Sequence, residues 1–392
     1  MVDEGDRVIE KKFSRRGFVA GVAAMPLALR EMAGEGIRDP KYVLLGTDKG
    51  KGIYRAAWSA ATGEIGMPEL AIETDRPTYF AMHPKKPVLY AANESNHGDG
   101  AVSAFRVDTR TAQLQALGKV STQGNGPCYV SVDQNGRSVF AANYGGGSLA
   151  AFNLSGDGAV QEPATVFKCN DNAACGITGP VTDRQDAAHL HCSVVSPDNH
   201  YLLVCNLGED AIEVFPLMAG EKPPIGDSVR FAARAGSGPR HVVFHPNGKW
   251  VYCIHELDCT IDVYEWRKGT LTLLGDSTVH TTATGASLTG ATGCEVVIDT
   301  RGKFVYANTR GENSLTVYRV NEKTGFLTEQ QRVQTGGTVT RLIALDPSWQ
   351  WLVCMNQGSS TVTVFSHNPK TGQLGEKPRT FAADSPMCVE WV

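Results

Sequence analysis

The chain has 392 residues, a formal net charge of −4 at pH 7 and 42 glycines. Basic residues never form a run longer than three, so a nucleic-acid partner has no electrostatic support. No apolar stretch reaches the roughly 18 residues that a membrane-spanning helix needs. Because no segment of the repeats has a sustained 3.6-residue apolar period, we expect little helix.

The first 38 residues differ from the rest of the chain. Twin arginines, Arg15 and Arg16, precede a short apolar run over residues 19–29. This order is typical of a twin-arginine export leader, and a basic tail without that role is the alternative. We therefore expect residues 1–38 to form a leader and linker read by the Tat export machinery. The mature protein would be periplasmic or otherwise exported, and cytoplasmic if the leader is not used.

Residues 39–392 repeat one eight-residue block six times, and a V-x-V-aromatic strand follows each block. The blocks are HPKKPVLY (83–90), DQNGRSVF (133–140), SPDNHYLL (196–203), HPNGKWVY (245–252), DTRGKFVY (299–306) and DPSWQWLV (346–353). In the last five repeats, the strand's aromatic residue falls 12 positions after the block. A period of roughly 50 residues with several short strands per repeat is the signature of a β-propeller.

The strands expected in chain order complete this architecture. The first repeat supplies only three strands, over residues 41–47, 52–58 and 67–73. Each later repeat supplies four antiparallel strands, which in the fifth repeat are residues 240–244, 250–255, 260–266 and 271–279. The last residues, 386–392, resemble the openings of the other inner strands. We therefore expect an all-β propeller of seven four-stranded blades, closed without a free edge by the C-terminal strand.

The ten cysteines give little support for a disulfide framework or a metal centre. Six lie in apolar strand segments, where cysteine usually serves as a small buried hydrophobe: Cys192, Cys205, Cys253, Cys294, Cys354 and Cys388. Cys169 and Cys175, in the long loop 165–188, are the one pair close in sequence outside the repeats, and a disulfide between them stays open. No C-x-x-C pair occurs, so a structural zinc site is not expected.

Propeller geometry brings distant residues to one mouth of the central channel. The start of an inner strand and the end of the next strand lie at the same end of their hairpin. The equivalent inner-strand positions are Thr78, Cys128, His191, Arg240, Cys294, Arg341 and Met387. The second-strand ends are Asn93, Asn143, Asn206, His255-Glu256, Thr309-Arg310 and Asn356. The longest loops, 165–188 and 276–293, emerge at this end and can cover it.

Three arginines on this mouth, Arg240, Arg310 and Arg341, repel one another unless an anion lies between them. Their planar guanidinium groups match a carboxylate or phosphate bidentately. The alternative is that each arginine pairs with a local acid such as Glu256 or Glu312.

Glu256 and two histidines are the candidate acid–base groups. A partly buried carboxylate at a channel mouth can have a raised pKa and transfer a proton, whereas a salt bridge to Arg240 or Arg310 is the alternative. His189 and His191 are two residues apart and share one face of a strand. Together with Glu256 they would also make a three-ligand metal site, but without further ligand clusters we expect neither a metal nor a cofactor.

Five stretches carry a family resemblance: GPCYVSVDQNGRSVFAANYGGGS, HLHCSVVSPDNHYLLVCNLGEDAIEVF, GSGPRHVVFHPNGKWVYCIHELDCTIDVY, CEVVIDTRGKFVYANTRGENS and DPSWQWLVCMNQGSSTVTVF. From about residue 41 onward the chain resembles the seven-bladed lactonase family, which includes propeller-type 6-phosphogluconolactonases and fungal carboxy-muconate lactonizing enzymes. The resemblance implies catalytic roles for four residues: His189, Arg240, Glu256 and Arg310. We expect the substrate to contact four more: His191, Arg341, His241 and Glu295. The chain departs from the family pattern at His255 and Ala188, where Asn and Pro are usual.

The expected activity is hydrolysis of the ring ester of an anionic or sugar-derived lactone, as in 6-phosphogluconolactonase and carbohydrate metabolism. The same groups would serve a cycloisomerase that forms a muconolactone-type product. A non-catalytic exported propeller that binds a peptide, glycan or protein is the third interpretation. Because a phosphorylated lactone is a cytoplasmic metabolite, an exported enzyme favours another substrate such as an aldonolactone. We expect a monomer or a weak dimer.

Overall fold

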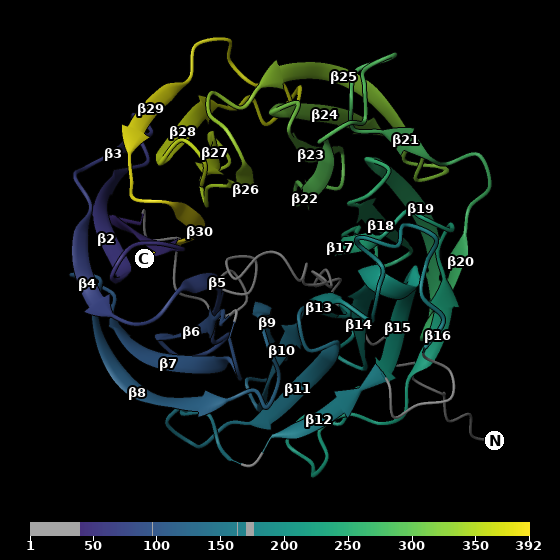
Figure 1. The fold of residues 1–392 in the computed structure, drawn as a ribbon. Helices are drawn as coiled ribbons and strands as arrows, with labels where there is room; N and C mark the ends of the chain where they lie inside the picture. The colour runs from purple at the N-terminus through teal and green to yellow at the C-terminus, as the bar shows by residue number, and fades with distance from the viewer. Residues whose placement is uncertain (1–39, 96, 163, 170–175) are drawn as a thin grey trace, which may run out of the picture.

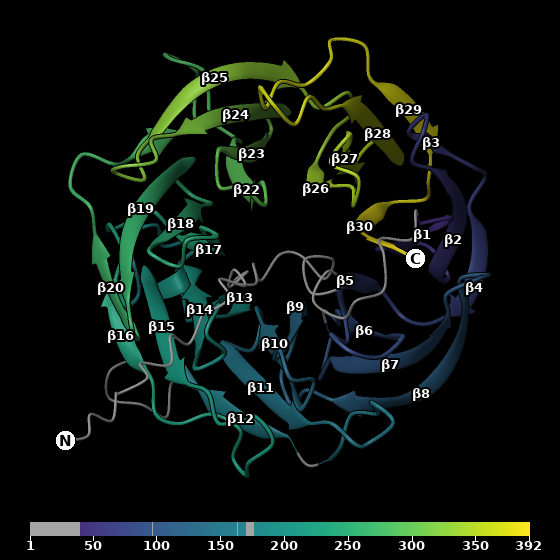
Figure 2. The same ribbon diagram turned by 180° about the vertical axis from the view of Figure 1, so that it is seen from behind.

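The computed structural model describes residues 40–392 except 96, 163 and 170–175. The expected leader over residues 1–38 and the cysteine at position 175 lie outside the described residues. Within the described part of the chain, seven antiparallel sheets surround a central opening like the blades of a propeller, as both views show (Figure 1, Figure 2). No helix in that part has the length and apolar character needed to cross a membrane. The seven-bladed all-β prediction is confirmed.

Blades 2, 3 and 4 each use four consecutive strands. Blade 2 contains β5 (Pro77–Met82), β6 (Val88–Asn93), β7 (Ala101–Asp108) and β8 (Gln113–Ser121). Blade 3 contains β9 (Pro127–Val132), β10 (Ser138–Asn143), β11 (Ser148–Asn153) and β12 (Thr165–Lys168). Blade 4 contains β13 (Leu190–Val195), β14 (Tyr201–Asn206), β15 (Ala211–Pro216) and β16 (Val229–Ala232), with the short 3-10 helix η3 (Leu207–Glu209) after β14. In each blade the first strand is innermost.

Blades 5, 6 and 7 repeat this order. Blade 5 contains β17 (Pro239–Phe244), β18 (Trp250–His255), β19 (Thr260–Arg267) and β20 (Thr270–Leu273), and β21 (Val279–His280) also pairs with β19. Blade 6 contains β22 (Thr292–Ile298), β23 (Phe304–Arg310), β24 (Ser314–Val320) and β25 (Leu327–Gln334). Blade 7 contains β26 (Thr340–Leu345), β27 (Trp351–Asn356), β28 (Thr361–Ser366) and β29 (Arg379–Ala382).

The two ends of the described chain meet in blade 1 and close the ring. Its N-terminal strands are β1 (Tyr42–Thr47), β2 (Gly52–Ser59), β3 (Glu64–Ile65) and β4 (Glu69–Glu73). The C-terminal strand β30 (Pro386–Trp391) pairs with β1 and becomes the inner strand (Figure 1). Beyond this ladder, the amides of Lys41 and Tyr42 donate to the carbonyl of Val392 at 3.0 and 3.1 Å. The predicted closure by the C-terminal strand is therefore present.

One predicted strand is wrong in its extent. The sequence suggested a continuous outer strand over residues 271–279, whereas β20 ends at Leu273 and β21 begins at Val279. Between them the chain turns at Asp276, which has a φ of 57°. A residue in this left-handed conformation cannot continue an extended strand, so the outer edge of the blade is divided.

The repeated eight-residue block is a tight turn made by its first side chain. Oδ1 of Asp133, Asp299 and Asp346 accepts the amide five residues later, at 2.8, 2.9 and 2.8 Å respectively. In two other blocks a histidine takes this place: the ring of His245 accepts the amide of Asn247 and contacts the Gly302 carbonyl of the next blade at 2.9 Å. The block therefore recurs because six of the seven blades begin with this hairpin, whereas in blade 1 the first two strands come from opposite ends of the chain.

The aromatic residue that follows each block fills the core. The five residues at this position are at most 2% exposed: Phe152, Phe215, Tyr264, Tyr318 and Phe365. Burying a side chain of this size stabilises the fold by roughly 1.5–3 kcal/mol each. The sequence period is thus the spacing at which each blade contributes its aromatic residue to the core.

Each inner strand contains a β-bulge at the same position, at the end that lies at the channel mouth. In blade 5, Pro239 pairs with His255 and His241 pairs with Ile254, which leaves Arg240 opposite no residue. The register shifts at the equivalent place in the other six inner strands. Because a bulge re-aims the side chain of its extra residue, the repeats place one such side chain per blade at one end of the channel.

Candidate functional site

Glu256 is the centre of a charged cluster at this mouth. It follows β18, and its Oε2 accepts from Nε of Arg240, on the bulge of β17, at 3.0 Å. Nη2 of Arg310, at the end of β23 in the next blade, lies 2.9 Å from the same oxygen. The expected convergence of these three residues is confirmed, although they come from three strands and two blades.

A third arginine joins the cluster from a loop. Nη2 of Arg184 donates to Oε1 of Glu256 and also lies 3.3 Å from the hydroxyl of Tyr144. Sequence reasoning placed the loop 165–188 over this mouth but missed Arg184 itself. Tyr144 was also missed, although it directly follows β10 as Glu256 directly follows β18.

The charges around Glu256 overturn one expectation. Burial alone would raise its pKa, but Arg310, Arg240 and Arg184 together hold the pKa well below the ordinary value. Glu256 is therefore ionised at neutral pH, and the idea that its pKa is raised is wrong. The alternative interpretation, a salt bridge to Arg240 and Arg310, is the one that the structure shows.

The cluster still carries an excess of positive charge. One carboxylate serves three guanidinium groups, and within the described residues Nε of Arg310 has no hydrogen-bond partner. No described carboxylate lies within ion-pair distance of Arg341, the bulged residue of β26. Burial, and then the guanidinium groups of Arg310 and Arg240, lower the pKa of Arg341. An anion or a developing oxyanion would be stabilised here.

The two histidines of the H-L-H segment have different surroundings. His189 faces an acceptor on both nitrogens: Nδ1 lies 3.0 Å from the carbonyl of Tyr144, and Nε2 lies 3.0 Å from Oδ1 of Asp186. Its ring also stacks on that of Tyr144, with centroids 4.5 Å apart. Both nitrogens of His189 are therefore engaged within the protein.

His191 is placed differently, as the bulged residue of β13. Its Nε2 lies 4.0 Å from Oε2 of Glu256, and its side chain is buried. Burial and then the charge of Arg240 lower the pKa of His191 well below 6.5. At neutral pH the ring is thus a neutral imidazole beside a carboxylate, which is the state in which it can accept a proton.

His241 and Glu295 form a hydrogen-bonded chain that ends on Arg240. Nδ1 of His241 is 2.8 Å from Oε1 of Glu295, so it carries the hydrogen of this contact. Its Nε2 accepts from Nη1 of Arg240 at 3.2 Å, and Nη1 of Arg240 also donates to the carbonyl of Cys294. These contacts fix Arg240, so the structure favours a positioning role for His241 and Glu295 over the substrate contacts that we expected.

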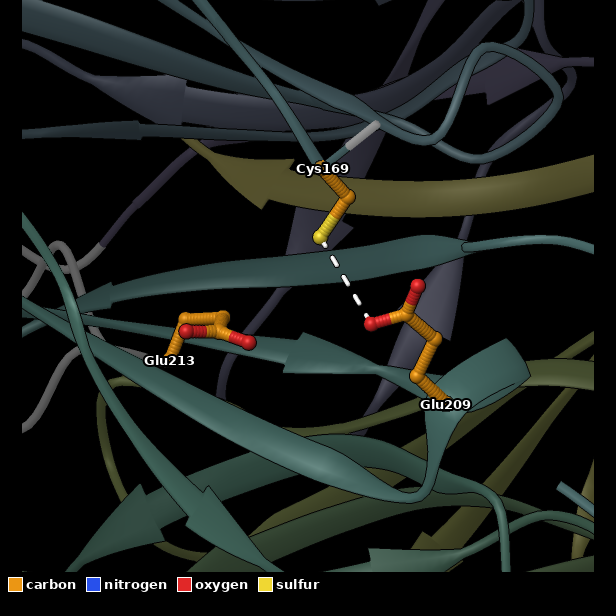
Figure 3. A group of neighbouring side chains, drawn as sticks. All are labelled: Cys169, Glu209 and Glu213. Atoms are coloured by element: carbon orange, nitrogen blue, oxygen red, sulfur yellow. Dashed lines mark hydrogen bonds between the residues drawn. The ribbon is translucent and has the colours of Figure 1, made fainter. Parts of the chain in front are cut away.

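One group of possible metal ligands occurs among the described residues: Cys169, Glu209 and Glu213 (Figure 3). Its carboxylate oxygens are already satisfied by donors. Nη1 of Arg230 lies 3.0 Å from Oε2 of Glu209 and 3.4 Å from Oε1 of Glu213. The side chain of Asn206 and the amide of Gly176 also donate to Glu209. An arginine within this group opposes a cation, so we interpret it as a structural network.

Comparison with known proteins gives a consistent result. The family described as "Lactonase, 7-bladed beta-propeller" matches residues 42–391. The chain is 30% identical over 342 residues to a 6-phosphogluconolactonase of Bacillus subtilis, which covers 87% of this chain and 95% of that protein. It is 30% identical over 320 residues to a 6-phosphogluconolactonase of Formosa agariphila, covering 79% and 87%. The periplasmic gluconolactonase of Pseudomonas aeruginosa superposes with a TM-score of 0.81 at 27% identity, over 90% of this chain and 98% of that one.

Proposed function

Because this chain belongs to the family of seven-bladed β-propeller lactonases, we propose that it hydrolyses the ring ester of an anionic or sugar-derived lactone. The relatives named 6-phosphogluconolactonase and gluconolactonase support this activity. The observation that carries the proposal is the cluster at the channel mouth, where a neutral, buried His191 adjoins an ionised Glu256 and its arginines.

In this mechanism, His191 is the general base. It takes a proton from a water molecule as the water oxygen attacks the lactone carbonyl carbon. The carbonyl becomes a tetrahedral oxyanion, which Arg240 and Arg310 stabilise. The imidazolium then gives its proton to the ring oxygen as the carbon–oxygen bond breaks, which releases a hydroxy acid. Glu256 stabilises the transient imidazolium and holds the arginines in place, rather than taking the proton itself.

The location of the enzyme bears on its substrate. We propose that the twin arginines direct export, so that the substrate is a lactone outside the cytoplasm, such as an aldonolactone. The neighbour named a periplasmic gluconolactonase supports this part of the proposal. Cell fractionation tests it: replacing Arg15 and Arg16 with Lys should leave the protein in the cytoplasm. An exported double variant would contradict the proposed route.

The activity itself is tested by acid release on a pH-stat. The panel contains glucono-δ-lactone, its 6-phosphate, a muconolactone and δ-valerolactone, each corrected for spontaneous hydrolysis. The wild type should release acid faster than buffer from at least one sugar-derived lactone, and His191→Gln should abolish this excess. No excess with any lactone would reject the lactonase proposal and leave binding of a macromolecular partner as the alternative.

A further inference from the structure

Each of the seven blades places two residues at the channel mouth: the bulged residue of the inner strand and a residue at the end of the second strand or directly after it. In blade 5 these are Arg240 and Glu256, which touch at 3.0 Å. In blade 2 the same two positions hold Thr78 and Glu94, since both hairpins have the same register shift. Blade 2 lies across the central opening from blade 5 (Figure 1).

In blade 2, a threonine side chain is shorter than the arginine that bonds Glu256 in blade 5. Polar atoms of both Thr78 and Glu94 therefore lack hydrogen-bond partners. Thr78 is 3% exposed, and no group in the described part of the chain bonds its Oγ1. Oε2 of Glu94 is likewise buried with no hydrogen-bond partner among the described residues. Buried polar atoms are nearly always hydrogen-bonded, so two adjacent exceptions at one mouth call for a ligand.

The nearest arginine does not satisfy Glu94. Nη2 of Arg76 lies 3.7 Å from Oε1 of Glu94, while Nε of Arg76 bonds Asp48 at 2.9 Å. Arg76 is thus engaged mainly by Asp48, and the second oxygen of Glu94 stays available as an acceptor.

The equivalent hairpin register places Glu94 at the same end of the ring as Glu256, and the charges there act on one another. The pKa of Cys128 is raised by burial and by Glu94, and Arg240 and Arg341 oppose the increase. Sγ of Cys128 lies 3.8 Å from Nδ1 of His191. Glu94 also acts on Arg341, without an ion pair between the two.

We propose that Thr78 and Glu94 form a subsite for the hydroxyl groups of the substrate, on the side of the mouth opposite Glu256. The inference rests on the lactonase activity proposed above and specifies its substrate as a polyhydroxylated, uncharged lactone. Hydroxyls of the lactone donate to Oε2 of Glu94, and the Thr78 hydroxyl donates to or accepts from a neighbouring hydroxyl. The carboxylate of Glu94 accepts from sugar hydroxyls through Oε2 and repels a phosphate at this end of the ligand.

The test compares two lactones that share a six-membered ring and differ in their hydroxyls: glucono-δ-lactone and δ-valerolactone. The quantity measured is the ratio of their kcat/KM values. Glu94→Gln should lower this ratio about 10-fold or more, because an accepting carboxylate oxygen becomes a donating amide. Thr78→Val should also lower this ratio of kcat/KM values. Glu376→Gln, on the exposed outer part of blade 7, is the matched control and should keep the wild-type ratio. An unchanged ratio in both mouth variants would overturn the subsite.

A binding measurement separates this inference from the lactonase proposal. Gluconate, which carries the same hydroxyls and needs no turnover, is titrated into each folded variant by calorimetry. Its affinity should fall about 10-fold in Glu94→Gln relative to Glu376→Gln. If no lactone is hydrolysed but gluconate affinity is lost in this way, the subsite is supported and the lactonase proposal is rejected. If lactone turnover is found and gluconate binds both variants equally, the subsite is rejected and the lactonase proposal is kept. Thr78→Val removes an unsatisfied buried hydroxyl, so a folding defect would not explain its effect.

Discussion

At the scale of single residues, the site depends on one carboxylate shared by three guanidinium groups. Glu256→Gln removes the negative charge and leaves Arg184, Arg240 and Arg310 to repel one another. Breaking a buried ion pair by removing one partner costs on the order of 3 kcal/mol. We expect kcat/KM to fall by about two decades or more, and the melting temperature to fall with it.

Sulfate provides the diagnostic for this explanation. The anion should raise the melting temperature of Glu256→Gln more than that of the wild type, because it replaces the lost charge between the arginines. Glu312→Gln, whose carboxylate lies 3.6 Å from Arg332, is the matched control. Equal effects of sulfate on all three proteins would show that the arginines are not left uncompensated.

The two histidines give the second residue-scale prediction. His191→Gln should lower kcat by about 10²- to 10⁴-fold, the usual loss for a general base, and His189→Gln should lower it less. Because burial lowers the pKa of His191, the acid limb of kcat/KM should fall at a pH below 6.5. A midpoint at or above 6.5, or a larger loss in His189→Gln, would assign the base to another group.

At the scale of elements, the sequence predicts the first hairpin of the blades but not the extent of the outer strands. The block of eight residues predicts these first hairpins because its first side chain, an aspartate, histidine or serine, accepts a backbone amide of the turn. The bulge in each inner strand leaves no such mark, although the equivalence of Thr78, His191 and Arg240 follows from it. The outer strand of blade 5 was misjudged because a single left-handed residue, Asp276, divides it.

Closure by β30 is the prediction that belongs to this scale. Deleting residues 386–392 removes the inner strand of blade 1, exposing the edge of β1 and the core around Trp391, which is 3% exposed. A protein lacking these residues should melt at a clearly lower temperature and aggregate more readily. Calorimetry of the two proteins checks this, and equal melting temperatures would contradict closure by this strand.

At the scale of the whole molecule, buried histidines predict how stability depends on pH. Five histidines among the described residues have a lowered pKa, chiefly through burial: His83, His191, His241, His245 and His367. In the unfolded chain each would titrate near 6.5, so between pH 6.5 and the folded pKa the unfolded state binds more protons. The free energy of unfolding should therefore fall as the pH drops below about 6.5.

His255 partly opposes this trend. Burial lowers its pKa, but Cys253 and Asp262 raise it to about 10, so the folded protein keeps this proton while the unfolded chain loses it as the pH rises through 6.5. The stabilisation from His255 therefore grows toward pH 5.5, but it is one group against the five whose pKa is lowered. Urea unfolding at pH 7.5, 6.5 and 5.5 checks the prediction. A free energy of unfolding that is constant or rises toward pH 5.5 would contradict it.

The sequence determined the overall architecture more fully than the site. Repeats identify the blades, and their alignment places Arg240, Glu256 and Arg310 at one mouth. The repeats carry no information on the path of the loop 165–188, so the contact between Arg184 and Glu256 was not predictable. The preference for His191 over His189 depends on which nitrogens are already engaged, a property of three-dimensional contacts that spacing does not encode.

The most direct test of the proposed active site is a crystal structure of the wild-type protein with an aldonate product bound. We predict that the carboxylate lies between Arg240 and Arg310, within hydrogen-bond distance of His191. A carboxylate bound outside this mouth, or at the other end of the channel, would contradict the proposed active site.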